Sequence, residues 1–139
     1  MNITIFGSGY VGLVTAICFA EVGNDVTCVD IDPQLIERLN NGDCLIYEPG
    51  LEAMLINNLA AKRIHFTIDA ASAMNSASVI FIAVGTPASE KGAADLQYVY
   101  NVANTIGKEL NHDAIVVNKS TVPVGTADEV KAIITSKVQ

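Results

Sequence analysis

Strand-like and helix-like runs alternate along the whole chain. Short, nearly continuous apolar runs, typical of parallel strands covered on both faces, are found at residues 3–6, 26–29, 64–67, 79–84 and 114–118. Helical patterns lie between and after them, at about residues 11–22, 33–40, 50–61, 69–75, 96–110 and from 126 onward. This alternation predicts an α/β fold built on a doubly wound parallel sheet.

Local signals at the helix ends support these boundaries. Gly23 and Asn24 follow the first helical run, and both residues tolerate the left-handed conformation of a helix C-cap. Asp32 and Pro33 open the second run, with the acid as N-cap and proline at the first helical position. No repeat, low-complexity tract or linker interrupts the pattern, so residues 1–139 are predicted to form one domain.

Composition limits what such a domain does. The net charge is −7 and no basic run occurs, which disfavours binding to nucleic acids and to anionic membranes. The most apolar helical run, residues 11–22, contains Glu21 and is too short to span a bilayer. No signal peptide is readable at the N-terminus. We therefore expect a cytoplasmic protein without nucleic-acid or membrane partners.

The three cysteines are scattered, without a CxxC pair or a histidine at metal-ligand spacing. This arrangement fits a reducing compartment and indicates neither a disulfide framework nor a metal site. Cys18 and Cys28 fall in apolar periodic runs and are predicted to be core residues. Cys44 lies in a predicted loop, where a reactive thiol is conceivable although nothing nearby would lower its pKa. His65 and His112 are isolated, and we assign them no chemistry.

A glycine turn follows the first strand and opens the first helix, with the sequence Gly7-Ser8-Gly9-Tyr10-Val11-Gly12. Gly7 allows a tight turn, Gly9 lets the backbone approach a pyrophosphate, and Gly12 lets the helix lie close to the sheet. Free N–H groups at the helix start, Tyr10 and Val11 included, would hold the phosphates together with the positive end of the helix dipole. The alternative is a glycine turn without a ligand.

Asp30 ends the second strand, where a dinucleotide-binding fold places the acid that accepts hydrogen bonds from the adenosine ribose. Its charge would repel the 2′-phosphate of NADP, and no Arg or Lys follows within the next seven residues. The sequence therefore predicts a Rossmann fold with NAD as its cofactor. Capping of the next turn is an alternative role for Asp30, but Asp32 fills it better, which leaves Asp30 free for the ribose.

Four further segments carry a resemblance to a known family. They read Tyr47-Glu48-Pro49-Gly50-Leu51, Ala83-Val84-Gly85-Thr86-Pro87, Gly92-Ala93-Ala94-Asp95-Leu96 and Lys119-Ser120-Thr121-Val122-Pro123-Val124-Gly125-Thr126. Together with the glycine turn, they resemble the N-terminal NAD-binding domain of the UDP-glucose/GDP-mannose dehydrogenase family, in the family's order and spacing. The first of the four is most similar to the UDP-glucose branch.

The resemblance implies a role for each segment. Val84, Gly85 and Thr86 leave a strand beside the first one, at the switch point where ligands bind, and would pack along the cofactor. Ser120 and Thr121 would lie near the nicotinamide, with Thr121 as an auxiliary residue that helps to position water or substrate. The residues expected on the nucleotide-sugar side, for which helix capping is an equal alternative, are Glu48, Gly50 and Leu51.

The family oxidises a sugar primary alcohol to a carboxylate by two NAD-dependent hydride transfers, with a cysteine that captures the intermediate aldehyde. The resemblance places that cysteine in a downstream glycine-rich motif, which none of the three cysteines here matches. We therefore expect the chain to bind NAD without turnover, as part of a longer enzyme whose nucleotide-sugar substrate is UDP-glucose. The alternatives are GDP-mannose or a UDP-N-acetylhexosamine as substrate, and a non-catalytic NAD-sensing module.

Some features depart from the family or stay open. Lys91-Gly92 stands where family members often have Asp-Gly, and Leu35 stands where many have a basic residue near the adenosine. Lys119 is either a solvated or helix-capping charge or a catalytic one. Dinucleotide folds commonly have six strands in the order 3-2-1-4-5-6, whereas this sequence contains five strand-like runs. The sheet is therefore predicted to stop before its sixth strand. Residues 114–118 would then be an apolar edge, through which a homo-oligomer could form.

Overall fold

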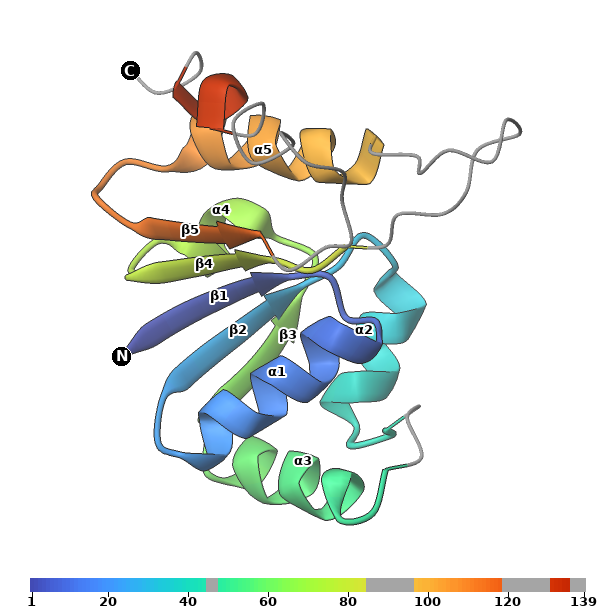
Figure 1. The fold of residues 1–139 in the computed structure, drawn as a ribbon. Coiled ribbons are helices and arrows are strands. Elements are labelled where there is room, and N and C mark those ends of the chain that lie inside the picture. The colour runs from blue at the N-terminus through green and yellow to red at the C-terminus, as the bar shows by residue number, and fades with distance from the viewer. Residues whose placement is uncertain (45–47, 85–96, 119–130, 136–139) are drawn as a thin grey trace.

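Five parallel strands form one sheet in the part of the chain that the structure, a computed structural model, describes: residues 1–44, 48–84, 97–118 and 131–135. Their order across the sheet is β3-β2-β1-β4-β5 (Figure 1). The chain therefore builds outward from β1 in both directions, as the predicted doubly wound sheet requires. The bounds are β1 Asn2–Phe6, β2 Asp25–Val29, β3 Ile64–Thr67, β4 Val79–Ile82 and β5 Ile115–Asn118.

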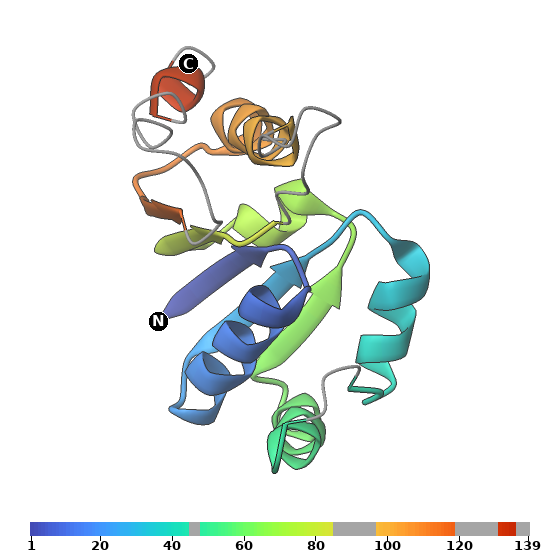
Figure 2. The same cartoon turned by 45° about the vertical axis from the view of Figure 1, so that its right-hand side comes forward.

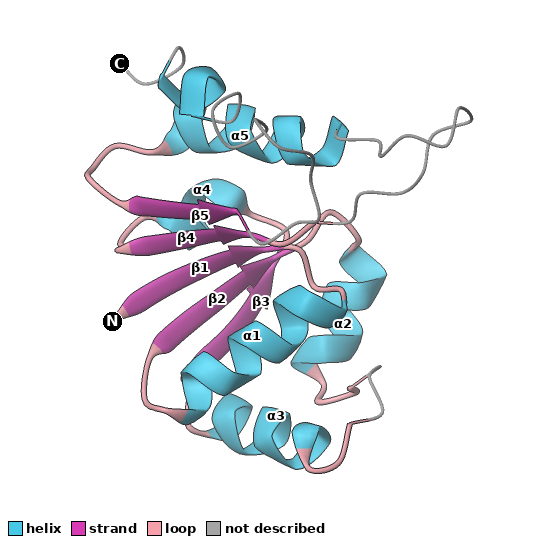
Figure 3. Cartoon of the chain, in the orientation of Figure 1, coloured by secondary structure: helices cyan, strands magenta, loops and turns pink. Residues whose placement is uncertain are grey.

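Helices cover both faces of this sheet (Figures 2 and 3). One face carries α1 Tyr10–Glu21, α2 Pro33–Asn40 and α3 Leu51–Ala60, and the other carries α4 Ala70–Met74 and α5 Gln97–Glu109. Residues 131–135 are also helical, within the last predicted helix. The strands and helices were thus predicted correctly, to within a residue or two at each end, except that the ends of the last helix fall outside the described residues. None of the helices in the described ranges is long and apolar enough to cross a membrane.

Two hydrophobic cores, one on each face, explain why the strands are almost continuously apolar. Ile3 and Ile5 of β1 belong to the first core, together with Leu13 and Ile17 of α1. Phe6 belongs to the second core, where α4 and α5 contribute their buried side chains. Because successive side chains of a strand point to opposite faces, a sheet covered on both sides needs apolar residues at nearly every position.

The predicted helix caps are present. Gly23 follows α1 with a φ of 103°, a left-handed conformation that favours glycine. The Asp32 side chain caps α2 by accepting hydrogen bonds from the backbone N–H groups of Gln34 (3.0 Å) and Leu35 (3.3 Å). These caps end one helix and begin the next at positions set by local sequence, which explains why the boundaries were predictable.

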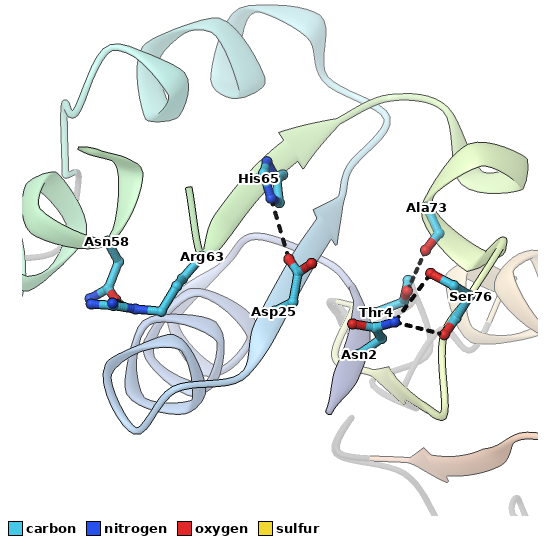
Figure 4. Close-up of polar contacts among 8 residues, drawn as sticks. All are labelled: Asn2, Thr4, Asp25, Asn58, Arg63, His65, Ala73 and Ser76. Carbon is cyan, nitrogen blue, oxygen red and sulfur yellow. Dashed lines mark hydrogen bonds and ion pairs between the residues drawn. The ribbon is translucent and has the colours of Figure 1, made fainter. Parts of the chain in front are cut away.

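Side-chain hydrogen bonds tie the amino edge of the sheet to the segment around α4 (Figure 4). The buried Thr4 hydroxyl donates to the Ala73 carbonyl (2.6 Å). The Asn2 amide donates to the carbonyl and hydroxyl oxygens of Ser76, both at 3.3 Å. These contacts satisfy polar groups at the end of the sheet that faces away from the glycine turn.

A buried amide links α1, α3 and the start of β3. Asn58 is fully buried, and its Nδ2 donates to Glu21 Oε2 and to the Met54 carbonyl, both at 2.7 Å. Its Oδ1 accepts a hydrogen bond from Arg63 Nε at 2.9 Å. Both polar atoms of this amide therefore have partners, so that its burial carries no unmatched donor or acceptor.

The predicted sheet edge lies at β5. This strand pairs with β4 on one side, and no strand in the described residues pairs with its other side. Ile115 is exposed there. Self-association through this edge stays a prediction.

Candidate functional site

The glycine turn leaves β1 in a conformation that only glycine adopts readily. Gly7 has a φ of 105°, and its N–H donates to the Val29 carbonyl at 2.8 Å, so the turn lies against the end of β2. A Cβ on Gly7 would stand 2.5 Å from the carbonyl oxygen of Ala83, just after β4. Both the backbone angle and the close approach of the neighbouring strand end therefore exclude a side chain at this position.

Gly12 brings α1 into direct contact with the turn that precedes it. A Cβ at this position would lie 1.9 Å from the Gly7 carbonyl oxygen and 3.5 Å from the Ala83 side chain. The close packing of helix against sheet, which the sequence predicted for this glycine, is thus a contact between Gly12 and the backbone of the turn itself.

Gly9, in contrast, has free space around it. Its φ of −74° and ψ of −164° suit any residue, and a Cβ built on it meets nothing within 4 Å among the described residues. The fold itself therefore gives no reason for glycine here. Gly9 is also the N-cap of α1. No side chain of a described residue caps this helix, and its first turn contains no acid. Free N–H groups and the positive end of the helix dipole thus face an open space.

A cleft of about 470 Å³ lies beside this turn, at the carboxyl edge of the sheet. Of the predicted cofactor residues, Gly7, Gly9, Asp30 and Val84 line it. Asp30 is the only acid among the described lining residues, and no Lys or Arg is among them. The other lining residues are Phe6, Ser8, Val29, Ile31, Ile68, Ala70, Ala83, Tyr98, Asn101, Val102 and Thr105.

Asp30 joins two turns. Its Oδ2 accepts a hydrogen bond from the Ser8 N–H at 2.9 Å, and its Oδ1 accepts one from the Asp32 N–H at 3.1 Å. Asp30 therefore also caps the turn that precedes α2, a role that the sequence predicted for Asp32 alone, although Asp32 does cap α2 as predicted. Each carboxylate oxygen can accept more than one hydrogen bond, so the half-buried Asp30 keeps capacity for ribose hydroxyls.

Sequence reasoning missed several residues of the cleft. The Ser8 hydroxyl is buried and finds no hydrogen-bond partner among the described residues, an unusual state for a buried polar atom. Because Ser8 lies inside the glycine turn, no separate sequence pattern marked it as a site residue. Tyr98, Asn101 and Thr105 reach the cleft from α5, because the sheet topology places this helix beside the end of β4. No local sequence pattern predicts that α5 lies beside the end of β4.

The segment predicted to border the nucleotide sugar lies at the start of α3. Leu51 is 3% exposed and packs in the first core, so the structure gives its side chain a packing role. Gly50 is the N-cap of α3 with a φ of 80°. Glu48 is exposed, and its Oε1 accepts a hydrogen bond from the Tyr10 hydroxyl at 2.7 Å. This hydrogen bond raises the pKa of Tyr10 above the usual value for tyrosine.

Val11, another predicted cofactor residue, lies in the first turn of α1 with an exposed side chain. The remaining predicted residues fall outside the described ranges. These are Gly85, Thr86, Lys119, Ser120 and Thr121, together with the departure from the family pattern at Lys91-Gly92.

One prediction about the cysteines was wrong. Cys18 is exposed, although it lies in an apolar helical run. Cys44 lies in a loop as predicted. Its side chain is buried in the first core, which the sequence did not predict. Cys28 is buried as predicted, and burial raises the pKa of its thiol far above the ordinary value.

The histidines make structural contacts. His65 Nε2 lies 3.3 Å from Asp25 Oδ1 across neighbouring strands (Figure 4). His112 Nε2 lies 2.7 Å from the Ala77 carbonyl oxygen. Neither residue lines the cleft.

A parallel sheet, a glycine turn that opens a helix at its carboxyl edge, and an acid at the end of the next strand define a dinucleotide-binding domain. Such a cofactor is fitted by backbone N–H groups for phosphates, by the open space at Gly9 and by the buried Ser8 hydroxyl, for which the described residues offer no partner. The chain belongs to the UDP-glucose/GDP-mannose dehydrogenase family, whose NAD-binding domain model matches residues 1–139. NAD is therefore its cofactor.

Individual relatives agree with this assignment. A UDP-glucose 6-dehydrogenase of Pseudomonas aeruginosa is 54% identical over 134 residues, which cover 96% of this chain and 30% of that protein. One from Bacillus subtilis is 52% identical, over 96% of this chain and 29% of that protein. The chain thus spans about a third of the length of the curated relatives it matches.

Solved structures show the same fold. A GDP-mannose dehydrogenase from Pseudomonas aeruginosa superposes with a TM-score of 0.93 and 39% identity, over 99% of this chain and 32% of that one. A UDP-glucose dehydrogenase from Pyrobaculum islandicum gives a TM-score of 0.91 and 40% identity, over 97% of this chain and 32% of that one.

Proposed function

We propose that this chain is the NAD-binding part of a longer UDP-glucose 6-dehydrogenase, which oxidises UDP-glucose to UDP-glucuronate. The observation that carries the proposal is the cleft at the glycine turn, in a chain whose curated relatives at 42–54% identity are UDP-glucose 6-dehydrogenases. By itself, the chain binds NAD without turnover. Three free cysteines support a reducing, cytoplasmic setting.

Different described residues contact different parts of the cofactor. The N–H groups at the start of α1 hold the pyrophosphate, with Gly9 allowing it to approach the backbone. Asp30 accepts hydrogen bonds from the ribose hydroxyls, and the apolar side chains of the cleft exclude water around the base. NAD⁺ held there would supply the hydride acceptor for oxidation of the substrate alcohol.

Asp30 also rejects NADP, and its two backbone contacts lead to a specific prediction. In Asp30→Asn, Nδ2 cannot accept, so one of the N–H groups of Ser8 and Asp32 loses its partner. We expect NAD⁺ affinity to fall by about tenfold or more, and the preference for NAD⁺ over NADP to narrow, because the charge that repels the 2′-phosphate is gone. Isothermal titration of the variant with both cofactors measures this.

The matched control is Asp32→Asn, because asparagine is as good an N-cap as aspartate. This variant should bind NAD⁺ like the wild type. Tight NADP binding by the wild-type chain would contradict the assigned role of Asp30. Binding of neither cofactor would contradict the proposed function itself.

The substrate is tested on the complete protein that contains this chain. With UDP-glucose and NAD⁺, we expect two NADH for each sugar nucleotide consumed. GDP-mannose is the second candidate, because a GDP-mannose dehydrogenase superposes over 99% of this chain. Faster NADH formation with GDP-mannose than with UDP-glucose would favour that candidate.

For the segments outside the described residues, the resemblance supports the proposal. Gly85, Thr86 and Ser120 would contact the cofactor, and Thr121 would be an auxiliary residue near the nicotinamide. Thr121→Ala in the complete protein separates an enzyme from a non-catalytic NAD sensor. An enzyme should lose kcat while keeping its affinity for NAD⁺, whereas a sensor should lose nothing.

A further inference from the structure

The start of α1 must be held in place while its backbone N–H groups stay free for a phosphate, and these two requirements usually conflict. A helix start is normally held by a side chain at the N-cap, which accepts a hydrogen bond from one of the first N–H groups. Gly9 cannot do this, and no other side chain in the described part of the chain caps α1. A capping side chain would also occupy donors that a bound phosphate needs. The first turn of α1 therefore needs a restraint that leaves its N–H groups free.

Tyr10 provides such a restraint. It is the first residue of α1, and its ring is largely exposed, so packing against the cores does not fix it. Its hydroxyl instead donates to Glu48 Oε1 at 2.7 Å. The contact joins residues 38 positions apart in the sequence and uses no backbone N–H of the first turn.

Glu48 is itself well anchored. Its carbonyl oxygen accepts a hydrogen bond from the Leu51 N–H at 3.1 Å, in a turn that contains the left-handed Gly50. Leu51 is buried in the first core, which also contains Leu13 of α1. The glutamate therefore stands on a turn that the core holds in place, close to the start of α1.

We propose that the Tyr10–Glu48 hydrogen bond is a positioning element of the cofactor site, which holds the first turn of α1 ready for the pyrophosphate. The inference rests on the proposed function, since it assigns the pair to NAD binding. The pair acts through the backbone of α1 and does not touch the reacting atoms. It also connects the cofactor turn to the start of α3, so that the two segments move together.

The test is a double-mutant cycle on NAD⁺ affinity, measured by isothermal titration of the chain. Tyr10→Phe and Glu48→Ala should each weaken binding by about three- to tenfold. The double variant should be no weaker than either single one, because both remove the same contact. Glu48→Gln should rescue binding, since the amide oxygen still accepts from the phenol. Glu37→Ala, which removes an exposed acid from α2, should leave affinity unchanged.

Two measurements without cofactor test the restraint itself. Amide hydrogen exchange in the first turn of α1 should be faster in Tyr10→Phe than in the wild type. The hydrogen bond to Glu48 raises the pKa of Tyr10, so the wild-type phenol stays protonated as the pH rises past its ordinary value. In Glu48→Ala, one tyrosine should therefore ionise at lower pH in an ultraviolet titration.

The outcomes separate the two proposals. Wild-type affinity in both single variants, or losses that multiply in the double variant, would overturn the positioning role alone. Stronger binding by Glu48→Gln would also overturn it, since the charge of Glu48 and not its hydrogen bond would then matter. Failure of the wild-type chain to bind NAD⁺ would overturn the proposed function, and the positioning role with it.

Discussion

Gly9→Ala is expected to abolish detectable NAD⁺ binding while the fold keeps its stability. The backbone at Gly9 is extended, and an added methyl group meets no atom within 4 Å among the described residues. Alanine also restricts the unfolded chain, so the free energy of unfolding should stay within about 1 kcal/mol of wild type. The space that the methyl group would fill is the one assigned to the pyrophosphate, and the loss in affinity should be about 100-fold or more.

Isothermal titration with NAD⁺ and urea unfolding, on the same preparation, measure the two effects. Normal stability with lost binding would assign the open space at Gly9 to the cofactor. Wild-type affinity in Gly9→Ala would show that no phosphate approaches this part of the backbone, and would contradict the proposed function.

Gly12→Ala is expected to do the reverse and to damage the fold first. Its Cβ would stand 1.9 Å from the Gly7 carbonyl oxygen, and neither atom can rotate away because both are fixed to the backbone. Relief requires a shift of α1, whose Leu13, Ala16 and Ile17 are essentially inaccessible to solvent. Such a shift opens the first core, so unfolding should become easier by about 3 kcal/mol or more.

The midpoint of urea unfolding measures this loss. An unchanged midpoint for Gly12→Ala would mean that the close contact between α1 and the glycine turn is not rigid. Ala16→Gly provides a comparison within α1, since it removes a buried methyl group and costs helix propensity without creating a clash. Gly12→Ala should be the more damaging of the two.

The fold was predictable because its signals are local. Each strand is apolar enough to be covered on both faces, and residues such as Asp32 and Gly23 mark helix ends by their own chemistry. The glycine turn was predictable for the same reason, since Gly7 and Gly12 restrict the backbone within one short segment.

The errors and omissions arose where tertiary contacts decide which side chains are buried or bonded. Helix α1 is apolar around most of its circumference, so its periodicity does not show that Cys18 faces solvent. Cys44 follows a helix as a loop residue would, yet the core formed by distant segments covers it. The hydrogen bonds from the N–H of Ser8 to Asp30 and from the hydroxyl of Tyr10 to Glu48 join residues far apart in sequence, and no spacing rule announces them.

The cleft without a Lys or Arg among its described lining residues has a kinetic consequence. A chain of net charge −7 and a cofactor that is itself negative repel each other at long range, and none of the described residues that line the cleft supplies a cation to offset this. Salt screens such repulsion over about 10 Å at 0.1 M. Added salt should therefore speed the association of NAD⁺, whereas proteins that capture phosphates with basic side chains lose association rate as salt rises.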